Sequence, residues 1–225
     1  PQSTTFQRSE AWRLLTQAKQ RPWRQTWTPY AQISTHLKRA VIASEDAGFS
    51  DHSGVEWEAL EKAWDRNLKA QARADQLNEK LDRRAERAGQ AHPAGNGRPR
   101  AEPKVVGGST ISQQLAKNLF LGAERNMARK AQEFVITFML EGLLGKRRLL
   151  EIYLNNVEWG EGVFGAQAAA AHYFRVPAAQ LSPLQAARLA VMLPAPKRFE
   201  RRPESPYLIG RAQVIQSRMT GVEPP

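Results

Sequence analysis

The chain has 225 residues, which is enough for one sizeable hydrophobic core. Its 33 Lys and Arg residues outnumber 22 Asp and Glu residues, and the formal net charge of +11 favours a polyanionic partner: nucleic acid, anionic lipid headgroups or a phosphorylated substrate. Because the sequence has no cysteine, disulfide bonds and thiolate metal sites are excluded. The best apolar run, at 134–140, is about a third of the roughly 20 residues that a membrane-spanning helix needs.

The first segment with chemical character is VIASEDAGFSDHSG, residues 41–54, in a helix-rich region. It places Glu45 and Asp46 after an apolar run and before a turn that ends at Gly54. Adjacent carboxylates repel each other, so the pKa of at least one should rise, and a carboxylate beside apolar side chains can serve as a general base or acid. A solvated pair at a helix end is the alternative. His52 is expected to be a hydrogen-bonded structural residue, since no zinc-ligand spacing accompanies it.

The composition changes at residues 69–104, which hold nine Lys and Arg residues against five Asp and Glu residues, a net charge of +4. The first half is expected to form a solvated helix. The second half contains three prolines and three glycines and buries too little to offset its ordering entropy. We therefore expect a mobile insertion, for which a loop without a role is the simplest interpretation.

The next segment, GGSTISQQLAKNLFL at 107–121, predicts a helix that Ser109 or Thr110 caps. Its predicted buried face consists of residues at i, i+4 and i+8: Ile111, Leu115 and Leu119. The opposite face carries hydroxyl, amide and amino groups: Thr110, Gln113, Gln114 and Lys117. A helix start behind two glycines favours an anion, and the amides favour a polar ligand such as a sugar. An ordinary capped surface helix is the alternative.

A second acidic motif lies in ARKAQEFVITFMLE, residues 128–141, where Arg129, Lys130 and Glu133 share one helix face. A surface salt-bridge helix is one interpretation. The turns after Glu133 are apolar almost all round, which predicts a buried helix whose three charged residues sit at its inner end and face a cleft.

From 107 to about 195 the pattern is helix after helix, and a further helical stretch follows at 209–219, so the predicted class is all-α. The sequence GEGVFG at 160–165 matches a dinucleotide-binding spacing. A helical pattern precedes it instead of a strand, and no acidic residue follows about 20 positions later. These glycines are expected to form a tight turn between helices.

Taken together, five motifs in order across 41–196 resemble the peptidoglycan glycosyltransferases, glycosyltransferase family 51. The first is the Glu-Asp-x-x-Phe-x-x-His-x-Gly pattern at 45–54, and the second is the quoted stretch at 107–121. Arg129, Lys130 and Glu133 match the third. The fourth and fifth fall at 146–174 and 181–196.

The resemblance implies an all-α, lysozyme-like glycosyltransferase fold in a single domain over residues 1–225, with a head lobe and a smaller membrane-proximal jaw lobe. It implies polymerisation of lipid II into β-1,4-linked glycan strands for the bacterial cell wall, with release of polyprenyl diphosphate. The insertion at 69–104 lengthens a spacing that is usually short in the family. The family also has an N-terminal transmembrane anchor, which is expected upstream of this sequence.

Residue by residue, Glu45 matches the catalytic general base of the family and Glu133 its second essential acid. The remaining motif positions are expected to bind substrate: Asp46, Ser109, Thr110, Gln114, Lys117, Asn118, Arg129 and Lys130. Glu45 or Asp46 is also the candidate ligand for a divalent cation, Mg²⁺ or Mn²⁺, and no organic cofactor is expected.

The resemblance implies lipid II, the growing glycan strand and membrane lipids as partners, along with cell-wall synthesis or division proteins, and no nucleic acid. The implied location is the bacterial inner membrane, with one membrane pass and the catalytic domain on the periplasmic side. The nearest alternative is a lysozyme-like hydrolase or lytic transglycosylase, which would have no diphosphate for Lys117 and Lys130 to hold. A nucleic-acid-binding module rests on the net charge alone.

Overall fold

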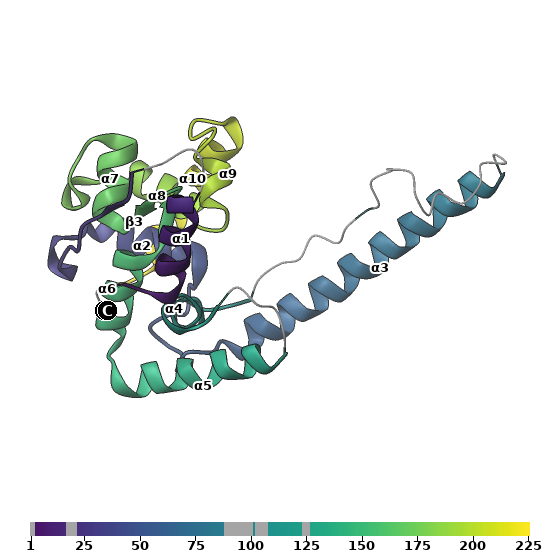
Figure 1. The fold of residues 1–225 in the computed structure, drawn as a ribbon, viewed down its shortest axis with the longest axis horizontal. Coiled ribbons are helices and arrows are strands. Elements are labelled where there is room, and N and C mark those ends of the chain that lie inside the picture. Colours follow the sequence, from purple (N-terminus) through teal and green to yellow (C-terminus); the bar gives the residue numbers. More distant parts are fainter. Residues whose placement is uncertain (1–2, 17–21, 88–100, 102–107, 123–126) are drawn as a thin grey trace. The chain divides into compact units, whose positions relative to one another are not determined.

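The computed structural model describes residues 3–16, 22–87, 101, 108–122 and 127–225 (Figure 1). The chain divides into two compact units. One comprises Pro1–Val55 with Thr110–Pro225, and the other comprises Glu56–Ser109.

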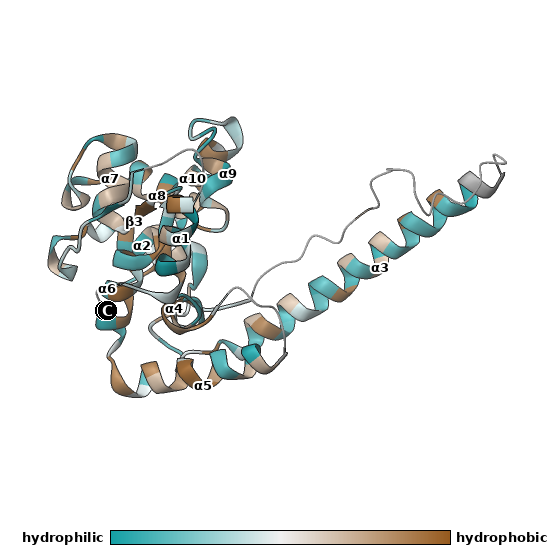
Figure 2. Cartoon of the chain, viewed as in Figure 1, coloured by the Kyte–Doolittle hydropathy of each residue, from teal (hydrophilic) through white to brown (hydrophobic). Residues whose placement is uncertain are grey.

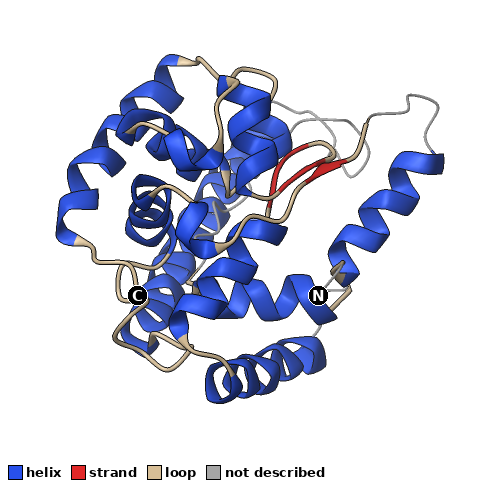
Figure 3. Cartoon of the chain, turned by 90° about the vertical axis from the view of Figure 1, so that its left-hand side faces the viewer, coloured by secondary structure: helices blue, strands red, loops and turns tan. Residues whose placement is uncertain are grey.

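The larger unit is built mainly from helices (Figure 3). In chain order they are α1 (Thr5–Thr16), α2 (Thr35–Glu45), α4 (Ile111–Phe120), α5 (Met127–Leu143), α6 (Lys146–Asn156), α7 (Ala166–Phe174), α8 (Pro183–Met192), α9 (Pro196–Phe199) and α10 (Pro206–Arg218). Single 3₁₀ turns lie at Tyr30–Gln32, Ala178–Gln180 and Met219–Gly221. The all-α prediction is confirmed, including the helix expected at 209–219; the division into head and jaw lobes stays a prediction.

One small sheet accompanies the helices. Its strands are β1 (Arg24–Gln25), β2 (Glu158–Gly160) and β3 (Val163–Phe164), in the order β1-β3-β2. Strand β3 is parallel to β1 and antiparallel to β2. The tight turn predicted within 160–165 is therefore present, but it joins two short strands, which the sequence analysis did not expect.

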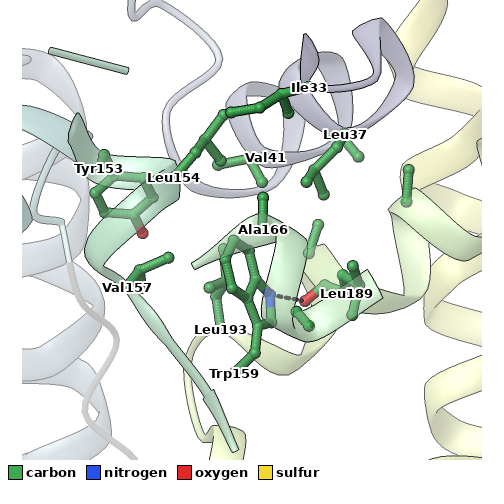
Figure 4. Packing of buried hydrophobic residues seen from close by; sticks show 14 of the residues in the cluster. Ile33, Leu37, Val41, Tyr153, Leu154, Val157, Trp159, Ala166, Leu189 and Leu193 are labelled. Carbon is green, nitrogen blue, oxygen red and sulfur yellow. Dashed lines mark hydrogen bonds between the residues drawn. The ribbon is translucent and has the colours of Figure 1, made fainter. Parts of the chain in front are cut away.

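The core of this unit forms where α2, α8 and α10 pack together. Val41 and Leu37 of α2 lie near Trp159 of β2, whose side chain is fully buried (Figure 4). The indole Nε1 of Trp159 donates a hydrogen bond to the backbone oxygen of Leu189 in α8 at 3.0 Å. This bond satisfies the one polar atom of the largest buried side chain and fixes β2 against α8.

The smaller unit contains α3 (Trp57–Arg87), a helix of 31 residues. Hydrophilic and hydrophobic residues alternate along it (Figure 2), and exposed i, i+4 ion pairs join Glu58 to Lys62 and Glu79 to Arg83. The helix expected in the first half of the 69–104 insertion is confirmed. The second half, predicted as a mobile insertion, lies outside the described residues except Ala101, whose backbone pairs with the Asn78 side chain.

Among the helices that the structure describes, none combines the length and the apolar character that crossing a bilayer requires.

Candidate active site

The site is centred on Glu45, the last residue of α2. Its Oε2 atom accepts a hydrogen bond from Nε2 of Gln114 in α4 at 3.0 Å. The Gln114 side-chain oxygen in turn accepts from the hydroxyl of Tyr153 in α6 at 2.9 Å. Three helices that are far apart in sequence thus hold one carboxylate in a fixed orientation. The uncharged amide on this face of α4 is explained, because a Glu at position 114 would repel Glu45.

Burial raises the pKa of Glu45 above its ordinary value, and the adjacent Asp46 charge raises it further. Hydrogen bonds from Gln114 and Ser44 act in the opposite direction. The predicted rise is confirmed, but its main cause is burial among the helices, with repulsion between neighbouring carboxylates contributing less. A carboxylate whose proton affinity is raised in this way is suited to accept a proton from a hydroxyl group.

The neighbouring Asp46 is 4% exposed, and both of its carboxylate oxygens accept hydrogen bonds from other parts of the protein. Its Oδ1 accepts from His52 Nε2 at 2.8 Å, and its Oδ2 accepts from the backbone N–H of Ile111 at 2.9 Å. His52 Nδ1 accepts from the Gly54 N–H at 3.0 Å, so Nε2 carries the proton donated to Asp46. The structural interpretation of His52 is confirmed. Asp46 joins the loop after α2 to the first turn of α4 and so holds Glu45 near Gln114.

The start of α4 is fixed by a capping box between Thr110 and Gln113. The Thr110 hydroxyl accepts from the Gln113 N–H and donates to the Gly54 carbonyl oxygen at 2.6 Å. The predicted buried face of this helix is confirmed: Ile111, Leu115 and Leu119. The predicted polar face is divided. Thr110 and Gln113 are buried and serve the helix start, whereas Lys117 is exposed.

The second acidic motif lies in the first turns of α5. Glu133 is 3% exposed, its Oε1 is ion-paired with Lys130, and its Oε2 lies 3.6 Å from Nη1 of Arg129. The ion pairs of the alternative interpretation are present, although Glu133 itself is buried, and the prediction that the three residues face a cleft stays a prediction. The prediction that the following turns are buried is wrong, because α5 exposes four apolar side chains: Val135, Phe138, Met139 and Leu143.

A third polar cluster was missed by the sequence analysis. Glu141 of α5 accepts hydrogen bonds from the Ser112 hydroxyl at 2.5 Å and from Lys146 Nζ at 2.8 Å. The Lys146 ammonium also lies 4.7 Å from the ring centroid of Phe49. The cluster joins α4, α5, α6 and the loop after α2, and no periodicity in the sequence pairs residues that are 29 positions apart.

The transglycosylase family profile matches residues 12–76 and 94–220, most of the chain. The chain belongs to the transglycosylase family. It is 49% identical to a biosynthetic peptidoglycan transglycosylase of Burkholderia thailandensis over 226 aligned residues, which cover 100% of this chain and 76% of the relative. The relative of the same name from Paraburkholderia xenovorans is 47% identical, with 100% and 81% covered. This transglycosylase is thus a glycosyltransferase that acts in peptidoglycan synthesis, as the motifs predicted.

Other predicted site residues of the transglycosylase are placed as follows. Asn118 is half-buried on α4, beside Lys117. Ser109 belongs to the smaller unit, next in sequence to the Thr110 cap. For each of these positions a contact with substrate stays a prediction.

The divalent cation predicted at Glu45 or Asp46 also stays a prediction. Both Asp46 oxygens accept hydrogen bonds from the protein, and Glu45 Oε2 is bound by Gln114. Mg²⁺ in proteins usually combines one or two carboxylates with substrate phosphates and water. The chemistry below is derived from the protein's own groups.

Proposed function

We propose that this transglycosylase polymerises lipid II into β-1,4-linked glycan strands and releases polyprenyl diphosphate. The observation that carries the proposal is the Glu45 carboxylate, which is partly buried, has a raised pKa and is oriented by Gln114. Lipid II contributes the acceptor hydroxyl and the growing strand contributes the activated sugar. The chemistry needs one base and one site for a leaving diphosphate.

Glu45 acts as the general base. It removes the proton from the 4-hydroxyl of the acceptor N-acetylglucosamine as that oxygen attacks C1 of the donor sugar. The new C1–O4 bond forms while the bond from C1 to the diphosphate oxygen breaks, and the electron pair leaves with the diphosphate. A single direct displacement converts the α-linked diphosphate into a β-linked sugar. The Gln114 amide orients the carboxylate, and the Tyr153 hydroxyl holds the amide.

Charge that develops on the leaving diphosphate is stabilised by cationic side chains of α4 and α5. Lys117 is exposed on α4, and Arg129 and Lys130 are partly exposed near the start of α5. Glu133 fixes the two α5 cations in place, because each of its carboxylate oxygens pairs with one of them. Cations held in position before reaction stabilise a developing anion without reorganisation.

Gln114 and Asn118, which are half-buried on α4, bind the sugars and the diphosphate in this proposal. A substrate contact from Ser109 or Thr110 stays a prediction of the resemblance, and the Thr110 hydroxyl is buried in the helix cap. Asp46 holds the start of α4 by accepting a hydrogen bond from the Ile111 N–H. These contacts would position the acceptor hydroxyl above Glu45, and proximity of this kind supplies a large share of a transferase's rate.

Membrane association is part of the same proposal, since lipid II is a membrane lipid. The exposed apolar side chains of α5 offer one surface for lipid contact: Val135, Phe138, Met139 and Leu143. Within the smaller unit, α3 exposes Trp57 and Trp64, and Trp side chains are favoured where one end is apolar and the other is wet, as at a membrane interface. We expect the basic residues of the 69–104 insertion to bind anionic headgroups. Residence at the inner membrane with a single pass and a periplasmic catalytic domain follows from the resemblance.

The activity is tested by incubating the purified protein with lipid II in detergent, with and without added Mg²⁺, and resolving the products by size. Long glycan is the expected product. Cleavage of preformed glycan without any polymer would replace the polymerase with the lytic class. Vesicle binding tests the membrane part: deletion of residues 69–104 should weaken binding to anionic vesicles, and unchanged binding would remove the proposed role of the insertion.

A further inference from the structure

A cavity of about 480 Å³ lies beside the loop that carries the first acidic motif. Its volume falls within the usual range for ligand pockets, roughly 300–1,000 Å³. Its walls come from α2, from the loop after α2, from the first residue of α6 and from the last five residues of the chain, 221–225. None of the residues to which the sequence analysis gave a role lines it.

The cavity has a defined polar lining. Lys146 contributes an ammonium group that is held by Glu141 and by the face of Phe49. Asp51 and Glu223 contribute carboxylates on exposed parts of the wall. Two exposed carboxylates beside an ammonium group that is ion-paired with Glu141 suit a ligand that carries N–H donors and one carboxylate, such as a short peptide.

The wall formed by the chain end is tied down at two points. The Tyr30 hydroxyl donates to the Pro225 backbone oxygen at 2.6 Å, and the Ser50 hydroxyl donates to the Glu223 backbone oxygen at 3.4 Å. The second bond attaches this wall directly to the loop after Glu45. The cavity therefore belongs to the folded larger unit, and one of its walls is hydrogen-bonded to the loop that follows Glu45.

The cavity also lies within reach of the catalytic residues. Lys146 and Tyr153 are separated by seven residues on α6, so they lie on one face of that helix, about 10 Å apart along its axis. Tyr153 reaches Glu45 through Gln114. A peptide of five residues extends over roughly 17 Å, which is more than this separation.

We propose that this cavity holds the stem peptide of the acceptor lipid II, an inference that rests on the proposed polymerase function. The acceptor disaccharide presents its 4-hydroxyl to Glu45, and the peptide on its second sugar enters the cavity. The terminal carboxylate of the peptide pairs with Lys146. Its N–H groups donate to Asp51 and Glu223.

The test separates acceptor from donor. A lipid II whose 4-hydroxyl is blocked serves only as donor, and the acceptor is lipid II with either the full pentapeptide or a single amino acid. At saturating blocked donor, wild type should show a KM for the truncated acceptor about tenfold above that for the full acceptor, with kcat nearly unchanged, as expected for loss of one charge-assisted contact.

The variants locate the effect. Lys146→Gln should abolish the difference in KM between the two acceptors, and Lys146→Arg should retain most of it. Asp51→Asn combined with Glu223→Gln alters only exposed side chains and should reduce the difference. Because each variant is compared with itself on two acceptors, a general loss of stability cancels.

Equal KM values for the two acceptors in wild type would overturn the inference while leaving the polymerase intact. An unchanged KM ratio in Lys146→Gln, with kcat lowered equally for both acceptors, would also overturn it and reduce Lys146 to a structural residue. Absence of any product from full lipid II would instead overturn the proposed function.

Discussion

The loop between α2 and α3 depends on a single glycine, and replacing it tests how the site is assembled. Gly54 has φ +91°, a left-handed backbone conformation that residues with a side chain rarely adopt. A Cβ atom built there would lie 2.8 Å from Cγ2 of Thr137 and 2.9 Å from Cγ of Glu141, both on α5. Gly54 also donates its N–H to His52 and accepts from Thr110.

From these contacts, Gly54→Ala should lower the free energy of unfolding by about 3 kcal/mol. Backbone strain at positive φ contributes about 1 kcal/mol, and overpacking against α5 contributes about 2 kcal/mol. For a chain of this size the melting temperature should fall by roughly 10 °C. Polymerisation should also fall at temperatures where the variant is folded, because the substitution would displace His52, which holds Asp46 beside Glu45.

The assay is urea unfolding followed by circular dichroism, with Gly142→Ala as the matched control. Gly142 lies inside α5 and a Cβ there would meet no atom within 4 Å, so the control should gain about 0.5–1 kcal/mol from improved helix propensity. An unfolding free energy for Gly54→Ala within about 0.5 kcal/mol of wild type would refute the packing argument, since ordinary surface changes fall in that range.

Three further predictions concern single hydrogen bonds or charges. Gln114→Met keeps the side-chain length but removes the hydrogen-bond donor that lowers the pKa of Glu45, so the acidic limb of the pH–rate profile should move to higher pH. An acidic limb at the same pH as in wild type would show that this hydrogen bond does not set the pKa of Glu45. Thr110→Val should cost about 1–2 kcal/mol in urea unfolding, through the lost cap of α4 and the unpaired Gly54 carbonyl. Burial on β2 raises the pKa of Glu158 from 4.5 to about 7. Between these pH values the folded protein keeps the Glu158 proton while the unfolded chain has lost it. The free energy of unfolding therefore falls as the pH rises from about 4.5 to about 7. Glu158→Gln should remove that loss and be more stable than wild type by about 3 kcal/mol at pH 8 but not at pH 4. Glu204→Gln, which changes an exposed side chain, is the control variant in the same measurement.

Much of this site could be predicted because its key residues are close in sequence or repeat with a helical period. Glu45 and Asp46 are adjacent, Arg129, Lys130 and Glu133 span just over one turn, and the buried face of α4 follows from its spacing. The rise in the pKa of Glu45 was predicted too, although repulsion by Asp46 is the smaller cause.

The rest depended on contacts between distant parts of the chain. Ser112, Glu141 and Lys146 meet only when three helices pack, so no local pattern reports them. The exposure of α5 was mispredicted for a related reason: the periodicity of a helix states how apolar it is, but not whether a protein surface covers it. The strands β2 and β3 are three and two residues long, too short for an alternating pattern to be recognised.

The central claim is that Glu45 is the general base of lipid II polymerisation, and the most direct test compares chemistry with binding in one variant. Glu45→Gln keeps the shape of the side chain and removes its ability to accept the proton, with Glu204→Gln as the exposed control. The rate of glycan formation and the affinity for lipid II would be measured on the same preparations. Loss of polymerisation by at least about a hundredfold, with lipid II affinity unchanged, is the result that the account predicts. Polymerisation by Glu45→Gln at a rate close to that of wild type would contradict it.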